Sequence, residues 1–183
     1  IDMYLPSLPA IARDLDSTIE MAQFTVTSYL AVFALAQLFM GPLSDMLGRR
    51  ATIGGGLILF SLGALGCALS GQMETLLGAR LVQASGGAAI AVTVPALVRD
   101  LFERDHYARV IGLVMLIMSL APLLAPSIGG VILIHASWHW VFISLLGIAL
   151  LASGLFLWLI PETLPPEHRH TLALGRGLGN YYG

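Results

Sequence analysis

Two ionisable residues, Asp2 and Arg80, stand in long apolar stretches of the sequence. At a rise of about 1.5 Å per residue, Asp2 is expected roughly 16 Å from the outer end of a first membrane span, near the midplane, and Arg80 about 8 Å inside the fourth. A charge at the centre of a bilayer is costly unless it faces a partner or a cavity. In a partly dry cavity Asp2 would hold a proton and release it when water or a cation enters. Such a carboxyl group could couple protons to a solute without covalent chemistry.

Gln83 follows Arg80 by one helical turn, which puts two polar groups on one helix face and favours a cavity there. Tyr4 and Tyr29 could line the same cavity, although hydrogen bonding between helices is the simpler interpretation of either. Two alternatives stay open: Asp2 is interfacial if the first span begins there, and Arg80 could extend to the outer headgroups. No span contains H-E-x-x-H, G-x-S-x-G or paired carboxylates, so we expect no enzyme activity, metal site or cofactor.

The composition predicts that membrane helices position these residues. Of 183 residues, 57% are hydrophobic and 11% are charged, whereas soluble domains carry about 25% charged residues. A membrane-crossing helix needs about 20 mainly apolar residues. Five segments meet that length: 21–43, 51–70, 75–98, 109–134 and 139–160. A soluble helical bundle would need polar outer faces, which the stretch 56–70 lacks.

Residues 1–13 resemble the second half of another span, so the prediction is an all-α membrane bundle of six helices over residues 1–160, with the first helix truncated. The chain opens with Ile rather than Met, and we expect it to be part of a longer chain. Prolines after residue 160 end the last helix, so residues 161–183 are expected to be a cytoplasmic connector. The net charge of −2 does not favour binding to nucleic acid.

The arginines predict the orientation of the bundle, because basic loops stay in the cytoplasm. Seven arginines lie in one set of alternate connections and one in the other; the seven are Arg49, Arg50, Arg99, Arg104, Arg109, Arg169 and Arg176, and the one is Arg13. Both ends of the chain are therefore expected in the cytoplasm. Trp138 and Trp140 are expected at the outer interface, and Trp158 near the inner one.

The most specific local pattern is GPLSDMLGRR at 41–50. It predicts a tight turn in which Gly41 allows close helix approach and Gly48 a positive φ. Asp45 is placed to pair with Arg49 or to face the positive end of a helix, while Arg49 and Arg50 form a basic pair. Charges at 99–105 are expected beside this turn, where salt bridges could latch one conformation. The alternative is a solvated loop that only fixes topology.

The pattern at 41–50 resembles the signature of the major facilitator superfamily, G-x-L-x-D-x-x-G-R-R/K. Residues 80–86 are similar to its fourth-span pattern R-x-x-Q-x-x-G, and residues 121–130 to its antiporter pattern G-x-x-x-G-P-x-x-G-G, with Ala121 and Ala125 replacing the leading glycines. Within the superfamily, DMYLPSLP and VRDLFERDHYAR resemble the Bcr/CflA drug-resistance group. WHW at 138–140 departs from the W-R-W of many relatives.

The resemblance implies a transporter of twelve spans in two halves that rock around a central site, with this chain as the first half. It implies a proton-coupled exporter of small amphipathic compounds in the bacterial inner membrane. The implied partners are the compound, protons, the lipid bilayer and the second half of the chain. In the antiporter segment, Pro126 can kink the helix, and Gly129 and Gly130 allow close packing. The alternatives are a metabolite exporter of the same fold and a structural membrane subunit, which would leave Asp2 and Arg80 unexplained.

Overall fold

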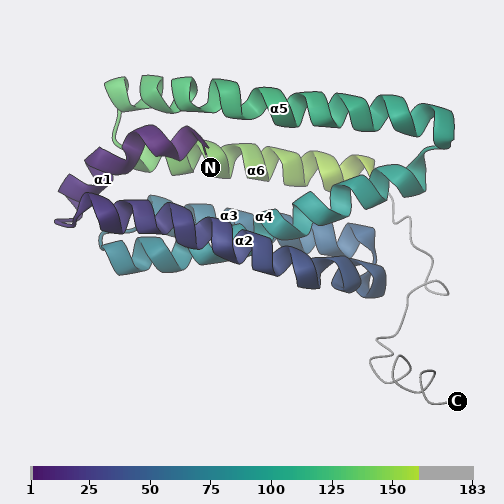
Figure 1. Cartoon of the computed structure of the whole chain (residues 1–183), viewed down its shortest axis with the longest axis horizontal. Coiled ribbons are helices and arrows are strands. Elements are labelled where there is room, and N and C mark those ends of the chain that lie inside the picture. Colours follow the sequence, from purple (N-terminus) through teal and green to yellow (C-terminus); the bar gives the residue numbers. More distant parts are fainter. Residues whose placement is uncertain (1, 161–183) are drawn as a thin grey trace, which may run out of the picture.

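A computed structural model describes residues 2–160, and all elements in this range are helical. A short 3₁₀-helix, η1, and six α-helices follow one another along the chain. Their bounds are η1 (Asp2–Ser7), α1 (Leu8–Asp14), α2 (Ile19–Leu47), α3 (Arg49–Ala68), α4 (Met73–Leu101), α5 (Arg104–His135) and α6 (His139–Leu159). The long helices run side by side along the long axis of the molecule (Figure 1). Residues 161–183, the expected connector, lie outside the described range.

Five of these helices, α2 to α6, are long and apolar enough to cross a membrane. This confirms the five predicted spans and the all-α class. The helices extend beyond the predicted spans, however, and include most of the polar segments 44–50 and 99–108 that separate those spans in the sequence. Only Gly48 separates α2 from α3, and only residues 102–103 separate α4 from α5. Charged residues are tolerated in helical conformation, and at the ends of a span they reach the polar headgroup region.

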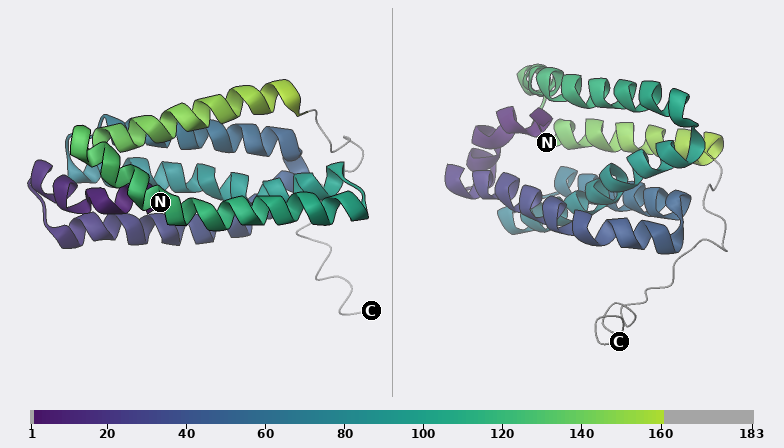
Figure 2. Two further views of the ribbon diagram at one scale, coloured as in Figure 1. Left: turned by 90° about the horizontal axis from the view of Figure 1, so that it is seen from above. Right: turned by 45° about the vertical axis from the view of Figure 1, so that its right-hand side comes forward.

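The first residues do not form a continuous α-helix. Pro6 lies inside η1, and Pro9 stands in the first turn of α1. A proline lacks a backbone donor, which interrupts the regular α-helical hydrogen-bond pattern. As a result, η1 packs against α5 while α1 packs against α2, and the two views of Figure 2 show this segment at one end of the bundle.

The centre of the bundle is the contact between α3 and α4, and α3 also packs on α6. A Cβ atom on Gly63 would lie 2.5 Å from the backbone nitrogen of Gln83, and one on Gly86 would lie 2.4 Å from that of Phe60. Glycine at these two positions therefore lets the backbones touch. This contact fixes the part of α4 that carries Gln83.

Much of the outer surface is apolar, as a membrane environment requires. Leu123 and Ile134 of α5 and Leu151 and Trp158 of α6 are more than two-thirds exposed. The side chain of Trp138 is only 1% exposed, so it does not face the lipid headgroups as the aromatic-belt prediction implies, and its depth in the membrane stays a prediction. Its indole nitrogen donates to Asp14 Oδ2 at 2.9 Å, which holds the tryptophan inside the protein.

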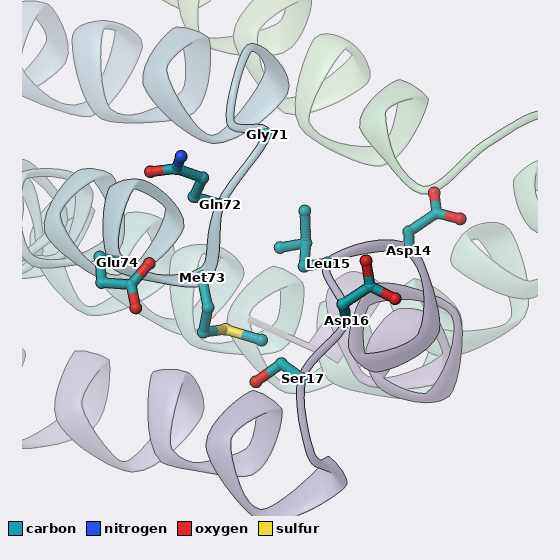
Figure 3. A pocket seen from close by; sticks show the side chains of 8 residues that line it. All are labelled: Asp14, Leu15, Asp16, Ser17, Gly71, Gln72, Met73 and Glu74. Atoms are coloured by element: carbon teal, nitrogen blue, oxygen red, sulfur yellow. The ribbon is translucent and has the colours of Figure 1, made fainter.

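The two ends of the bundle differ in charge. At the end where α1 meets α2 and α3 meets α4, a cavity of about 310 Å³ lies beside three carboxylates (Figure 3). Its lining residues are Asp14, Leu15, Asp16, Ser17, Gly71, Gln72, Met73 and Glu74. The opposite end, where α2 meets α3 and α4 meets α5, carries Arg49, Arg50 and Arg99. This asymmetry follows from the alternation of arginines along the sequence.

Candidate functional site

Arg80 is the centre of the candidate site. It lies on α4 with its side chain buried, at 1% exposure, so it does not extend to the surface of the described structure. Its guanidinium carbon lies 4.6 Å from the ring centre of Tyr4, 4.1 Å from that of Tyr29 and 6.0 Å from that of Phe142. A cation over aromatic faces is stabilised by the quadrupoles of the rings. The rings come from η1, α2 and α6, so four elements meet at one charge.

The hydrogen bonds of Arg80 are incomplete. Its Nη1 donates to Gln83 Oε1 at 2.7 Å. Its Nε and Nη2, together with Gln83 Nε2, are buried and have no acceptor among the described residues. A buried donor without an acceptor costs about 1–3 kcal/mol, and more when it is charged. Arg80 and Gln83 thus present three unused donors at one place.

Tyr4 is held over the guanidinium by a short hydrogen-bond chain. The Thr25 hydroxyl donates to the carbonyl of Ala22 at 2.6 Å, and the Tyr4 hydroxyl lies 2.6 Å from Thr25 Oγ1. Since Thr25 has one hydroxyl proton, Tyr4 is the donor to Thr25. The ring of Tyr4 also packs on Phe142, with centres 5.3 Å apart. These contacts orient the η1 segment toward α2 and α6.

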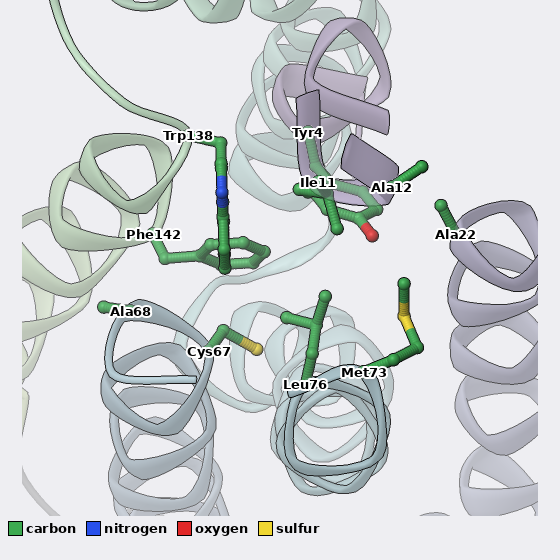
Figure 4. Close-up of a cluster of buried hydrophobic side chains, with 10 residues drawn as sticks. All are labelled: Tyr4, Ile11, Ala12, Ala22, Cys67, Ala68, Met73, Leu76, Trp138 and Phe142. Carbon is green, nitrogen blue, oxygen red and sulfur yellow. The ribbon is translucent and has the colours of Figure 1, made fainter. Parts of the chain in front are cut away.

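This site lies beside the main buried cluster, where side chains from η1, α1, α2, α3, α4 and α6 converge (Figure 4). The cluster consists of Tyr4, Ile11, Ala12, Ala22, Cys67, Ala68, Met73, Leu76, Trp138 and Phe142. Figure 4 shows the rings of Tyr4, Trp138 and Phe142 together, with Cys67 and Leu76 on the opposite side of the cluster. An apolar wall of this kind lowers the local dielectric and strengthens the electrostatic interactions of a neighbouring charge.

Of the residues that the sequence singles out, Arg80, Gln83, Tyr4 and Tyr29 come together, but Asp2 does not join them by an ion pair. Asp2 is half-buried at the start of η1, and the ion pairs of the described residues do not include it. The 16 Å expected for Asp2 assumes one straight helix, and the break between η1 and α1 removes that assumption. Its role in proton coupling stays a prediction.

A second cluster of polar groups joins α2, α3 and α4 at the arginine-rich end. Arg49 is 6% exposed; its Nη1 donates to Ser44 Oγ at 2.8 Å and to Asp45. Its Nε donates to Asp100 Oδ2 at 3.0 Å. The predicted pairing of Asp45 with Arg49 is confirmed, and Asp100 confirms the expected salt bridge from segment 99–105. Arg50 instead donates to the carbonyl of Leu157 near the end of α6, at 2.8 Å.

The tight turn predicted over 41–50 is reduced to one residue. α2 continues through Pro42 to Leu47, and Gly48 alone breaks the helix, with φ 98° and ψ 153°. The positive φ expected at Gly48 is confirmed. The expectation for Gly41 is wrong, because a Cβ atom there would lie 3.8 Å from Val92 Cγ1, an ordinary contact distance. A side chain at position 41 would therefore fit beside Val92 without movement of either helix.

The antiporter segment continues as α-helix through Pro126 and supports η1. A Cβ atom on Gly129 would lie 2.0 Å from the carbonyl oxygen of Met3, which confirms close packing at this glycine. For Gly130 no atom of the described residues lies within 4 Å of its virtual Cβ, so close packing at this glycine stays a prediction. Ala125 and Pro126 are half-buried. The segment thus positions the backbone next to Tyr4.

Sequence reasoning missed two residues of the site, Thr25 and Phe142. A hydroxyl inside a predicted span was an available signal for Thr25, because it needs a hydrogen-bond partner in the membrane. Phe142 is an aromatic residue in an apolar helix, and no pattern distinguishes it from lipid-facing residues. Its role depends on how α6 packs against η1.

The comparison with known families matches the sequence patterns. A model of the Major Facilitator Superfamily matches residues 1–177. The chain belongs to this superfamily. Membership in a superfamily of transporters agrees with five membrane-crossing helices and identifies the chain as part of an integral, multi-pass membrane protein.

Several curated members of the superfamily are similar over most of this chain. It is 41% identical over 174 residues to the bicyclomycin resistance protein homolog of Haemophilus influenzae, covering 95% of this chain and 44% of that protein. It is 40% identical over 177 residues to the MFS-type transporter YdgK of Bacillus subtilis, and the match covers 96% of this chain and 44% of that protein. It is 34% identical over 165 residues to a chloramphenicol resistance protein of Pseudomonas aeruginosa, and the match covers 89% of this chain and 39% of that protein. The chain thus spans less than half the length of these relatives, and the resemblance to drug-resistance transporters is confirmed.

Proposed function

We propose that the chain forms the N-terminal bundle of a proton-coupled exporter in the bacterial inner membrane. The exporter would exchange small amphipathic compounds for protons by alternating access. The observation that carries this proposal is Arg80, a charge buried among three aromatic rings in a membrane helix. Buried ionisable residues of membrane helices are costly and mark solute or proton pathways. The names of the relatives, which refer to resistance to bicyclomycin and chloramphenicol, support export.

The proposed cycle needs no covalent step, so it needs neither a cofactor nor enzyme chemistry. The compound binds near Arg80 and Gln83, while Asp2 carries the proton. The ion pairs of Arg49 with Asp45 and Asp100 join α2, α3 and α4 at one end of the bundle and would stabilise one conformation of that end. Opening of these pairs would change the side from which the site is reached.

The experiment is a flux measurement on the complete protein in proteoliposomes, with and without an imposed pH gradient, using radiolabelled chloramphenicol as the probe. We expect the gradient to drive export in the wild type. Asp2→Asn should abolish the effect of the gradient while the compound still binds, because an amide cannot release a proton. The control is Asp16→Asn, the same change at an exposed position where the backbone has φ 45°. Gradient-driven export by Asp2→Asn at the wild-type rate would contradict the role of Asp2.

The orientation of the bundle is part of the same proposal. The end that carries Arg49, Arg50 and Arg99 would face the cytoplasm, because basic residues are retained there. A reporter fused after residue 180 should show cytoplasmic activity, whereas one inserted at 71–74 should read as external. The reverse pattern would overturn the orientation and leave the helix assignment intact.

A further inference from the structure

The unused donors of Arg80 and Gln83 carry information about the exported compound. We infer that this pair binds a hydrogen-bond acceptor on the compound, so that the site selects aromatic compounds with a carboxylate, nitro or carbonyl group over organic cations. The inference rests on the proposed function, because it takes the surroundings of Arg80 as the solute site. It adds the chemical class of the solute.

The nitrogen atoms of Arg80 that have no hydrogen-bond acceptor indicate the shape of the group that would bind there. Nε and Nη2 form one edge of the planar guanidinium, and neither has an acceptor among the described residues. Two parallel N–H groups on one edge match the two oxygens of a carboxylate or a nitro group. Gln83, bound to the other side of the guanidinium through its oxygen, adds Nε2 as a third donor.

The aromatic rings around Arg80 lie over the guanidinium, so a ligand can bind only at its edge, through Nε and Nη2. Tyr4 and Tyr29 lie over the guanidinium at 4.6 and 4.1 Å. In the conformation described, the donors are enclosed, so the compound reaches them after η1 or α2 has moved away. This is the kind of movement that alternating access requires.

Charge favours the same class of compound. The carboxylates that form ion pairs in the described part of the chain bind Arg49 and Arg99, and none of them binds Arg80. A cationic compound would meet an unneutralised positive charge at low dielectric, which is repulsive. An acceptor instead gains charge-assisted hydrogen bonds and removes the cost of the unpaired donors.

The first measurement compares three probes that share one aromatic body: 2-naphthoate, 2-naphthamide and (2-naphthylmethyl)trimethylammonium. Binding to the purified complete protein is measured by titration calorimetry. We expect the two acceptor-bearing probes to bind at least about tenfold more tightly than the cation, the size of one or two charged hydrogen bonds. Equal or tighter binding of the cation would overturn the inference without the use of any variant.

The second measurement supplies the acceptor from the protein itself. Gln83→Glu keeps the size of the side chain, places a carboxylate against Nη1 of Arg80 and removes the Nε2 donor. The carboxylate neutralises the guanidinium charge and repels an anionic acceptor. We expect this variant to bind 2-naphthoate and 2-naphthamide about tenfold more weakly and the cation no more weakly than before. Gln72→Glu is the matched control, because Gln72 is exposed in the connection between α3 and α4. Unchanged binding of all three probes by a folded Gln83→Glu protein would also overturn the inference.

The two proposals fail in different ways. If the acceptor-bearing probes bind preferentially but a pH gradient drives no export, the proposed function is wrong and the binding inference stands. If a pH gradient drives export and the cation is the preferred ligand, export stands and the inference about Arg80 and Gln83 is wrong.

Discussion

Arg49 and Arg80 are both buried, at 6% and 1% exposure, on helices that touch each other. Arg49 donates to two carboxylates and one hydroxyl, Asp45, Asp100 and Ser44. Arg80 donates to one amide oxygen and otherwise faces aromatic rings. The first charge is balanced within the described part of the protein, and the second is not. The comparison separates a group that holds helices together from a group that, in the proposal above, binds a ligand.

The largest expected effect comes from changing each arginine to methionine. Arg80→Met should abolish export but leave the unfolding temperature unchanged or slightly higher, because an unbalanced buried charge is replaced by an apolar chain. Arg49→Met should lower the unfolding temperature by several degrees, since Asp45 loses its ion-pair partner and Asp100 keeps only the longer contact with Arg99, at 3.8 Å. Thermal unfolding in detergent and flux in proteoliposomes measure the two effects. If Arg80→Met lowered the unfolding temperature as much as Arg49→Met, Arg80 would hold helices together as Arg49 does, and the proposed difference between the two arginines would be wrong.

The second prediction concerns the support of Tyr4 by α5. Gly129→Ala should place a Cβ atom against the carbonyl of Met3, where it would lie 2.0 Å away without movement. Relief of this overlap shifts η1 and costs about 1–3 kcal/mol, so export should fall by about tenfold. Gly130→Ala is the control, because its Cβ meets nothing within 4 Å. Equal rates of export for the two variants would show that α5 does not position the site of Arg80.

The smallest effects are expected where Arg49 meets its acidic partners. The side chain of Asp45 is 49% exposed and that of Asp100 is 23% exposed. Exposed ion pairs contribute about 0.2–1 kcal/mol, so Asp45→Asn should slow export about twofold and Asp100→Asn about fivefold, with membrane insertion intact. Glu103→Gln, an exposed change at the same end, is the control. A larger effect for Asp45→Asn than for Asp100→Asn would contradict this order.

Sequence alone was sufficient for the spans and for local pairs. Long apolar segments identify helices because the bilayer fixes their length, and Asp45 and Arg49 are close because they are four residues apart along the chain. The ends of the helices were misplaced, since nothing in the polar segment 44–47 prevents α2 from continuing. The backbone at Gly48 was predictable, because glycine adopts a positive φ at little cost.

The contacts between distant segments were less predictable. Gly129 and Gly130 are alike in sequence, and only the path of η1 past α5 determines which one is in contact. Trp138 was expected at the interface from its residue type, but Asp14, far away in the chain, accepts its indole proton. The rings around Arg80 come from three other elements, so their meeting depends on the packing of the whole bundle.

The direct contact of the α3 and α4 backbones has a mechanical consequence. With no side chain between Gly63 and Gln83, or between Gly86 and Phe60, no change of rotamer can absorb a slide of one helix along the other. Helices α3 and α4 therefore move together as one rigid unit. Arg49 lies in the first turn of α3, and Arg80 lies part-way along α4. The Arg49–Asp100 ion pair joins α3 to α4 and lies within this unit, whereas the Arg49–Asp45 pair joins the unit to α2. If α3 and α4 move away from α2 and the Arg49–Asp45 pair opens, Arg80 is carried along in the same movement. In the proposed transport cycle, opening of the Arg49–Asp45 pair and displacement of the bound compound would then be a single event rather than two successive ones.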